Sequence, residues 1–140
     1  MPTEFPFRHR LDVRFRDCDS MGHVNHAVYL TYLEQSRFAF WRQITGAPPG
    51  TRAGIIIARA EIDYRAPAFA GDLLEVQLAV EAIGTSSFTL VYQIVKVAMD
   101  TVLAEARTVL VTYDYDANRK VPVPAQTRGF LERARGGVVE

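Results

Sequence analysis

The sequence of 140 residues contains a single cysteine, Cys18, and no long apolar run. One cysteine excludes an intramolecular disulfide and is compatible with a reducing compartment. No stretch approaches the roughly 20 apolar residues that a membrane-spanning helix needs, and the first ten residues lack the apolar segment of a signal peptide. These absences predict a soluble, cytoplasmic protein without a membrane span.

The sequence also lacks an excess of charge of one sign, since 16 Lys and Arg face 16 Asp and Glu. Nucleic acid is therefore not an expected partner, because phosphate binding requires a surplus of basic residues on one face. The chain has no Gly-x-Ser-x-Gly nucleophile elbow and no phosphate-cradling glycine loop. The spacing of His23, His26 and the nearby aspartates matches no specific metal motif. We expect neither a metal nor an organic cofactor.

What the sequence does contain is a polar segment, residues 17–25, followed by a long apolar one, residues 27–44. Because apolar residues cover most of the circumference of this predicted helix, we expect it to be buried on several sides. Gly46 suits a left-handed C-terminal cap and Pro48 cannot continue a helix, so the helix is predicted to end near Thr45. The main apolar stripe at helical spacing consists of Tyr29, Leu33, Phe40 and Ile44.

The rest of the chain favours strands. Residues 9–16 alternate, with Leu11, Val13 and Phe15 on the expected core face. Short turns between the later strands predict that these are mostly antiparallel neighbours. A basic segment, residues 126–135, is predicted as a short terminal helix. The four later predicted strands span residues 54–64, 74–82, 88–95 and 102–113.

This order of elements predicts one α+β domain covering residues 1–140, with a loose arm at residues 1–6 and a tail at residues 136–140. In this domain a curved antiparallel five-stranded sheet wraps around one long central helix. That arrangement buries both the apolar helix and the apolar faces of the alternating strands.

The segment from Asp17 to Tyr29 reads Asp-Cys-Asp-Ser-Met-Gly-His-Val-Asn-His-Ala-Val-Tyr and opens the long helix. This motif resembles that of the hotdog-fold acyl-CoA thioesterases of the hydroxybenzoyl-CoA thioesterase type. Residues 61–68, Gly71-Asp72 and residues 86–88 support the resemblance, which covers about residues 9 to 115. It implies the hotdog fold, hydrolysis of acyl-CoA to free acid and CoA, and a homodimer or a tetramer formed as a dimer of dimers.

The resemblance places the catalytic carboxylate at Asp19. An ionised aspartate can act as a general base toward water or attack the thioester carbonyl directly. The resemblance also implies an oxyanion donor at the backbone N–H of His26, where unpaired N–H groups and the helix dipole favour negative charge. Asp17 is instead expected to stabilise the loop. Cys18, between two carboxylates, is a poor nucleophile.

The remaining candidates have a structural interpretation beside the functional one. Asn25 occupies the expected N-cap position, but it could also hold water or the Asp19 carboxylate. His23 either assists catalysis or only forms hydrogen bonds within its loop, and Tyr29 either contacts substrate or packs in the core. The expected substrate-binding residues are Gly22, Tyr29, Arg59, Ser86 and Ser87.

Two other functions fit the same motif, namely a thioesterase acting on acyl groups carried by a protein and a non-catalytic module that binds acyl thioesters. An ionised Asp19 beside an electrophilic carbonyl favours the enzyme over the binding module. The stretch Gly84-Thr85-Ser86 carries no charge, whereas an aromatic-acyl relative has a basic cluster there. We therefore expect the acyl group and pantetheine arm to provide most of the recognition, with Arg59 and Arg65 as the nearest basic candidates.

Overall fold

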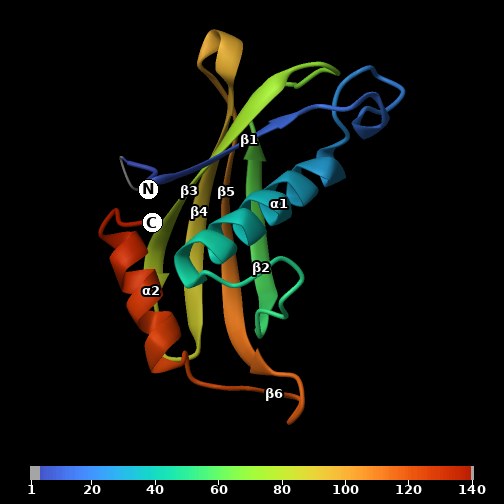
Figure 1. The fold of residues 1–140 in the computed structure, drawn as a ribbon. Coiled ribbons are helices and arrows are strands. Elements are labelled where there is room, and N and C mark those ends of the chain that lie inside the picture. The colour runs from blue at the N-terminus through green and yellow to red at the C-terminus, as the bar shows by residue number, and fades with distance from the viewer. Residues whose placement is uncertain (1–3, 140) are drawn as a thin grey trace.

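A computed structural model describes residues 4–139 and shows an antiparallel sheet curved around a long helix, as predicted (Figure 1). The strand order in the sheet is β1-β3-β4-β5-β2, and a short strand, β6, pairs with the end of β5. The strands are β1 (Phe7–Asp12), β2 (Ile55–Tyr64), β3 (Leu73–Ile83), β4 (Ser87–Lys96), β5 (Thr101–Asp114) and β6 (Arg119–Lys120). The helices are α1 (His26–Thr45), α2 (Ala125–Arg135) and the single 3-10 turns η1 (Phe15–Asp17) and η2 (Val97–Met99).

Helix α1 begins and ends where its flanking residues predict. The side chain of Asn25 accepts a hydrogen bond from the N–H of Ala27, and Gly46 adopts a left-handed conformation at φ 72°. The predicted stripe packs against the concave face of the sheet, and Trp41 stacks on Phe88 of β4 with ring centroids 5.7 Å apart. The stripe residues Tyr29, Leu33, Phe40 and Ile44 are all at most 6% exposed.

One face of α1 departs from the expectation of burial on several sides. Leu30 and Phe38 are 43% and 44% exposed, and Glu34 between them is exposed as well. The neighbouring strand β2 is also open, with Ile57 46% exposed. Within the described residues β2 pairs only with β5, so its other backbone edge is uncovered.

The first strand differs from its predicted bounds of residues 9–16. It ends at Asp12, and the chain then turns through η1, because the Asp17 carboxylate accepts a hydrogen bond from the N–H of Arg14. Phe15 is consequently 89% exposed and does not join the core face. In the predicted N-terminal arm, residues 1–3 lie outside the described residues, whereas Phe5 is buried against Ala79 and Val91.

Strands β2 and β3 are consecutive in sequence but are not neighbours, contrary to what a short connection suggests. β2 pairs with β5, whereas β3 pairs with β1 and β4. Their connection, residues 65–72, crosses the end of the sheet and packs against the polar loop. The N–H of Val24 donates to the carbonyl of Ala68 at 2.9 Å, and the N–H of Gly71 donates to the carbonyl of Val13 at 2.9 Å.

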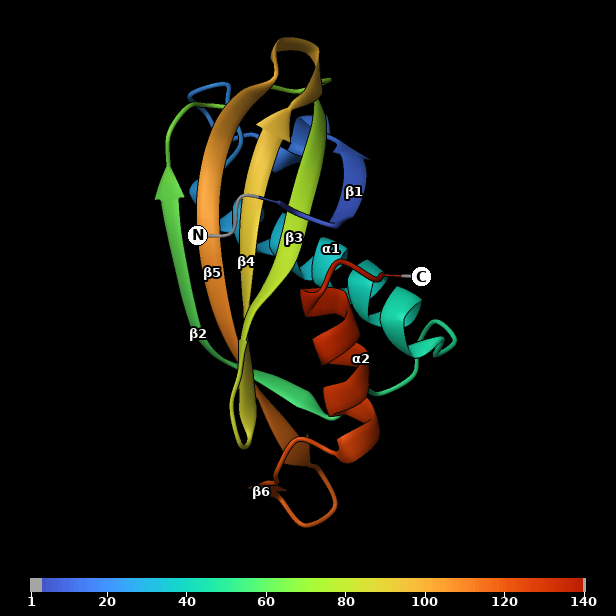
Figure 2. The same ribbon diagram turned by 90° about the vertical axis from the view of Figure 1, so that its left-hand side faces the viewer.

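Helix α2 completes the protection of the β3 edge. β1 pairs only with residues 73–78 of β3, and α2 packs beside β3 and α1, as Figure 2 shows. Leu131 and Ala134 are the buried residues of α2, and Arg128 donates to the carbonyl of Gly84 at 2.6 Å. Covering an edge in this way prevents it from pairing with another chain.

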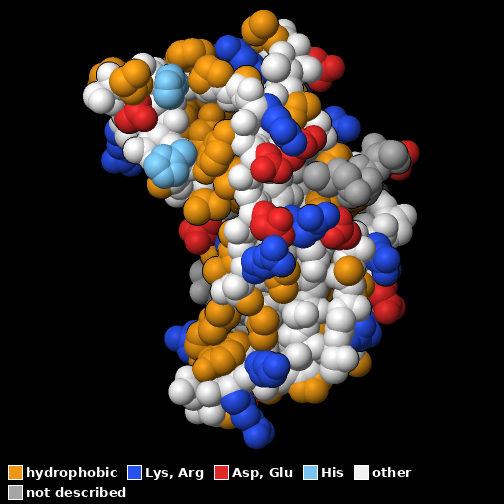
Figure 3. Space-filling view, turned by 180° about the vertical axis from the view of Figure 1, so that it is seen from behind, with side chains coloured by type: hydrophobic (Ala, Val, Ile, Leu, Met, Phe, Trp, Pro, Cys, Tyr) orange, Lys and Arg blue, Asp and Glu red, His pale blue; other side chains and the backbone are white. Residues whose placement is uncertain are grey.

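The convex face of the sheet is charged, with basic and acidic side chains intermixed in the view from behind (Figure 3). These charges are largely paired across strands. Arg8 and Arg10 of β1 contact Glu75 of β3, and Arg107 of β5 contacts Glu81. This face therefore offers no large field of one sign to an anionic or cationic partner.

Asp17 connects the polar loop to the core. The residue is 3% exposed, and its carboxylate accepts hydrogen bonds from the Tyr32 hydroxyl at 2.7 Å, the Arg14 N–H at 3.0 Å and the Arg14 guanidinium at 3.1 Å. Burial alone would raise the pKa of Asp17, but the hydrogen bonds from Arg14 and Tyr32 outweigh it and hold the pKa below its ordinary value. The ionised form is thus the one that the fold stabilises.

We predict that Asp17→Asn lowers the free energy of unfolding at pH 7 by about 1–3 kcal/mol, because it leaves buried donors poorly paired. Since the folded pKa is depressed, this contribution is present above the unfolded pKa of about 3.9 and is lost as the pH falls through the folded value. Urea unfolding of both proteins across this pH range should show the difference shrinking under acid conditions. Equal unfolding midpoints at pH 7 would contradict the prediction.

Candidate active site

A cavity of about 350 Å³ lies where the polar loop, the first turn of α1 and the end of β2 meet. It brings together Asp19, His23, His26 and Tyr29, all predicted as site residues from the sequence, and Arg65, one of the two basic candidates. The remaining lining residues are Val24, Tyr64, Ala66 and Pro67.

Asp19 is held by a tight turn of its own loop. Its N–H donates to the carbonyl of His23 at 3.0 Å, and its carbonyl accepts from the N–H of Gly22 at 3.0 Å. Gly22 has a φ of 88°, which explains the glycine, because a side chain at this position would be strained. Carboxylate Oδ1 accepts from the N–H of Met21 at 2.9 Å, whereas Oδ2 accepts no hydrogen bond from the described residues. One oxygen orients the carboxylate and the other remains available.

Within the described residues, the first turn of α1 contains an unpaired backbone donor at His26, a residue that lines the same cavity. The N–H of Ala27 donates to the Asn25 side chain at 2.9 Å, and the N–H of Val28 donates to the Asn25 carbonyl at 2.9 Å. Asn25 is thereby confirmed as the N-cap. The N–H of His26 has no acceptor among residues 4–139, as expected for the first residue of a helix. It can therefore donate to a ligand in the cavity.

Tyr64, at the end of β2, is a part of this site that sequence reasoning did not single out. Its hydroxyl donates to the carbonyl of His26 at 2.8 Å, and its ring packs edge-on against that of Tyr29 with centroids 5.2 Å apart. Burial raises the pKa of both tyrosines, so their hydroxyls stay protonated at neutral pH. Ile62 and Tyr64 are two residues apart and therefore share one face of β2, and this spacing is the sequence signal for the position of Tyr64.

The other two loop candidates lie against the walls of the cavity. Tyr29 is 3% exposed and forms part of the core as well as the cavity lining. His23 pairs with Phe69 through a β-bridge, and its ring packs edge-on against the Phe69 ring with centroids 6.3 Å apart. Both positions combine a packing role with a place in the cavity.

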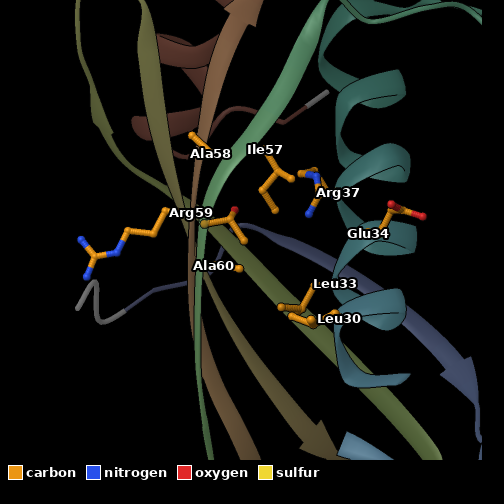
Figure 4. Close-up of a pocket in the computed structure, with 9 residues that line it drawn as sticks. Leu30, Leu33, Glu34, Arg37, Ile57, Ala58, Arg59 and Ala60 are labelled. Carbon is orange, nitrogen blue, oxygen red and sulfur yellow. The ribbon is translucent and has the colours of Figure 1, made fainter. Parts of the chain in front are cut away.

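Four predicted substrate-binding residues, Gly22, Arg59, Ser86 and Ser87, do not line this cavity. Arg59 pairs with Glu61 at 3.2 Å and extends from β2 away from α1 (Figure 4). Ser87 lies opposite Val111 of β5, whereas Tyr64 lies opposite Ala104. Ser86 and Ser87 are therefore at the other end of the sheet from Asp19 within one chain.

The uncharged stretch Gly84-Thr85-Ser86 has a basic neighbour that the sequence did not reveal. Arg128 of α2 donates to the Gly84 carbonyl at 2.6 Å, although it is 44 residues further along the chain. A guanidinium therefore lies close to the serines, and it comes from the segment that the sequence predicted only as a short basic helix.

Two kinds of feature are absent from the described part of the chain. Residues 4–139 contain no group of three or more His, Cys, Asp or Glu side chains arranged to hold a metal ion. Neither helix within this range has the combination of length and apolar character needed to span a bilayer.

Comparisons with known proteins agree with the fold and the motif. The family model described as the thioesterase-like superfamily matches residues 13–131. The acyl-CoA thioester hydrolase YbgC of Escherichia coli O6:H1 is 30% identical over 111 residues, which cover 77% of this chain and 82% of YbgC. YsmA of Bacillus subtilis is 27% identical over 90 residues, and the match spans only 61% of its length.

Solved structures extend the likeness to nearly the whole chain. A thioesterase from Thermus thermophilus, complexed with coenzyme A and Zn, is 32% identical with a TM-score of 0.84, and the match covers 96% of this chain and 98% of that one. A predicted thioesterase from Bacillus stearothermophilus is 26% identical with a TM-score of 0.84, covering 91% and 95%. The chain therefore belongs to the thioesterase-like superfamily and has the hotdog fold.

Proposed function

We propose that this chain hydrolyses acyl-CoA thioesters to a free acid and CoA. The observation that supports this proposal most directly is that Asp19 and His26 both line one cavity, and that the N–H of His26 has no acceptor among residues 4–139. The name of the relative YbgC, an acyl-CoA thioester hydrolase, and the coenzyme A in the Thermus thermophilus structure point to the same substrate.

In the proposed reaction the thioester carbonyl lies in the cavity with its oxygen toward the N–H of His26. Asp19 either takes a proton from the attacking water or attacks the carbonyl carbon itself to form an anhydride that water then hydrolyses. In either route the tetrahedral intermediate collapses by breaking the C–S bond, and the thiolate leaves as CoA and takes up a proton. The His26 N–H and the α1 dipole stabilise the developing oxyanion.

Two side chains fix the position of this donor. Asn25 caps α1, and Tyr64 holds the carbonyl of His26 at 2.8 Å, so the first turn is restrained at both its N–H and its C=O groups. A donor that is already oriented costs no reorganisation when charge develops. His23 lines the cavity, and we assign it a supporting role in orienting water or substrate.

We further propose that the working unit is a homodimer, alone or as half of a tetramer, in which two β2 edges pair. The exposed side chains of Leu30 and Ile57 lie together beside this uncovered edge, and unprotected edges with apolar neighbours favour pairing. A two-fold axis makes the paired strands antiparallel. The Ser86-Ser87 end of the partner subunit then lies at the Asp19 end of the first, so each site combines a loop with strands of the other subunit.

We predict that Asp19→Asn lowers kcat by at least about a hundredfold, the lower range for a positioned acid–base group. The asparagine oxygen can still accept from the N–H of Met21, so the loop should keep its shape. Assaying a panel of acyl-CoA esters by release of free thiol tests this, with Asp17→Asn as a variant that affects stability more than catalysis. Undiminished activity in Asp19→Asn would remove Asp19 from the mechanism.

The backbone role of His26 predicts different outcomes for two substitutions. His26→Ala keeps the N–H and should retain most activity, whereas His26→Pro deletes it at the first helical position, where proline is tolerated. The proline variant should fold but lose about two to three orders of magnitude in kcat, as loss of one oxyanion donor does. If the alanine variant is as inactive as the proline variant, the imidazole is the functional group.

The proposed β2 interface predicts a dimer or tetramer by light scattering at micromolar concentration. Ile56→Lys places a charge on the edge strand and should shift the protein toward the monomer. Activity should fall with dissociation, since each site needs strands of the partner. A wild-type monomer at micromolar concentration, active in hydrolysis, would contradict this assembly.

Acyl-CoA and acyl-carrier-protein substrates should be compared in the same thiol-release assay. Faster hydrolysis of the protein-bound acyl groups would identify a carrier-protein thioesterase. Binding of acyl-CoA without any thiol release would identify a non-catalytic binding module.

A further inference from the structure

A second cavity, also of about 350 Å³, lies between α1 and β2 (Figure 4). Its apolar wall is formed by Leu30 and Leu33 of α1 and by Ile57, Ala58 and Ala60 of β2. The other lining residues are Glu34, Arg37, Arg59 and Thr108, so the predicted residue Arg59 lies at this cavity and not at the first one. Ala58 is also the residue at which the pairing of β2 with β5 shifts register. Such bulges often occur beside binding sites.

This second cavity follows the catalytic cavity along the same seam between helix and strand. Leu30 comes directly after Tyr29 in α1, and Ala60 precedes Tyr64 by four residues in β2, with Tyr29 and Tyr64 lining the catalytic cavity. Arg37, at the far end, is eleven residues beyond His26, which corresponds to roughly 16 Å along the helix. An acyl group bound at Asp19 can extend along this seam.

Arg37 is the unusual residue of the second cavity. It is 6% exposed and extends from α1 toward Ile57 (Figure 4). Among the described residues no carboxylate lies within 4.0 Å of its guanidinium. Its only hydrogen bond within residues 4–139 is a long one of 3.4 Å to the Tyr92 hydroxyl, which in turn shares a 2.6 Å hydrogen bond with Thr108.

A buried cation without a counter-charge is unfavourable unless other groups compensate for its lost hydration. A guanidinium carries five N–H donors in a planar fork that fits a carboxylate with two parallel hydrogen bonds. Arg37 uses one of these donors for Tyr92, so donors remain for a ligand. The apolar walls leading to it suit a hydrocarbon chain.

We propose that Arg37 determines acyl specificity by binding a carboxylate at the distal end of the acyl group. The preferred substrates would then be CoA thioesters of dicarboxylic acids, with one acyl end at Asp19 and the free carboxylate at Arg37. This inference rests on the proposed thioesterase function and specifies its substrate class. The distal carboxylate takes no part in the reaction and serves only for recognition.

The test compares matched pairs of CoA thioesters, a dicarboxylic half-thioester and the unsubstituted acyl-CoA of equal chain length, over a series of lengths. At the length that spans the seam, the wild type should prefer the carboxylate-bearing member by about tenfold or more in kcat/KM, the scale of a hydrogen bond to a charged group. Arg37→Met should reduce this ratio to about one by lowering kcat/KM for the carboxylate-bearing member alone. Arg37→Lys should retain part of this preference, because the positive charge remains but the paired guanidinium donors are lost.

Arg107→Met is the matched control. Arg107 precedes Thr108 in β5 but pairs with Glu81 on the convex face, so its removal should leave the ratio unchanged. A wild-type ratio of one or less at every length would overturn the proposal. So would an Arg37→Met variant that slows both members of each pair equally.

An alternative ligand for the Arg37 guanidinium is the Glu34 carboxylate of a partner subunit, and Glu34→Gln tests this alternative. If Arg37 pairs with that carboxylate across a dimer interface, Glu34→Gln and Arg37→Met should weaken the oligomer alike and leave the substrate ratio unchanged. Light scattering together with the ratio of kcat/KM values distinguishes this subunit contact from substrate recognition. A subunit contact of this kind would overturn the proposal.

Binding to Asp19→Asn, measured by calorimetry, distinguishes failure of this inference from failure of the proposed function. Suppose that the wild type hydrolyses no thioester, that Asp19→Asn binds the carboxylate-bearing thioester at least about tenfold more tightly than the unsubstituted one, and that adding Arg37→Met removes this difference. The proposed hydrolysis is then wrong, and the proposed recognition site at Arg37 stands. If hydrolysis proceeds with no preference in rate or binding, the proposed function stands and the role of Arg37 is wrong.

Discussion

The buried carboxylate of Asp17 is the interaction on which the arrangement of the site depends. It joins the turn after β1, through Arg14, to the middle of α1, through Tyr32. The backbone carbonyl of Asp17 also accepts a hydrogen bond, at 2.9 Å, from the N–H of Asn25, the residue immediately before the helix. One residue therefore sets where the polar loop leaves the strand and where α1 begins, and Asp19 lies between these two points.

This dependence explains why Asp17 and Asp19, two residues apart, differ in their surroundings. Asp17 is enclosed by three donated hydrogen bonds, so its charge is satisfied within the protein. Asp19 lines the cavity, with one carboxylate oxygen fixed by the N–H of Met21 and the other without a hydrogen bond from the described residues. Similar sequence surroundings thus give one structural and one accessible carboxylate, because only the first faces the core.

The sequence predicted those features that local physical chemistry determines. The ends of α1 follow from Asn25 and Gly46, and the alternating strands were located to within a few residues. The features it missed depend on contacts between distant segments. The burial of Arg37 and the contact of Arg128 with Gly84 arise only when distant segments pack together. The spacing of residues within a single helix or strand does not predict them.

The two sides of the sheet differ in how their strand edges are covered, and this difference limits how further chains can pair with the sheet. On the β3 side, β1 and α2 occupy the edge, whereas on the β2 side the edge is uncovered within the described residues. At the other end of the sheet β1 is also an edge strand, but it is only six residues long and carries Arg8 and Arg10, features that disfavour pairing with another chain. Two-fold pairing of β2 uses the same edge of both subunits, so that edge is closed after one addition and the assembly through it is finite.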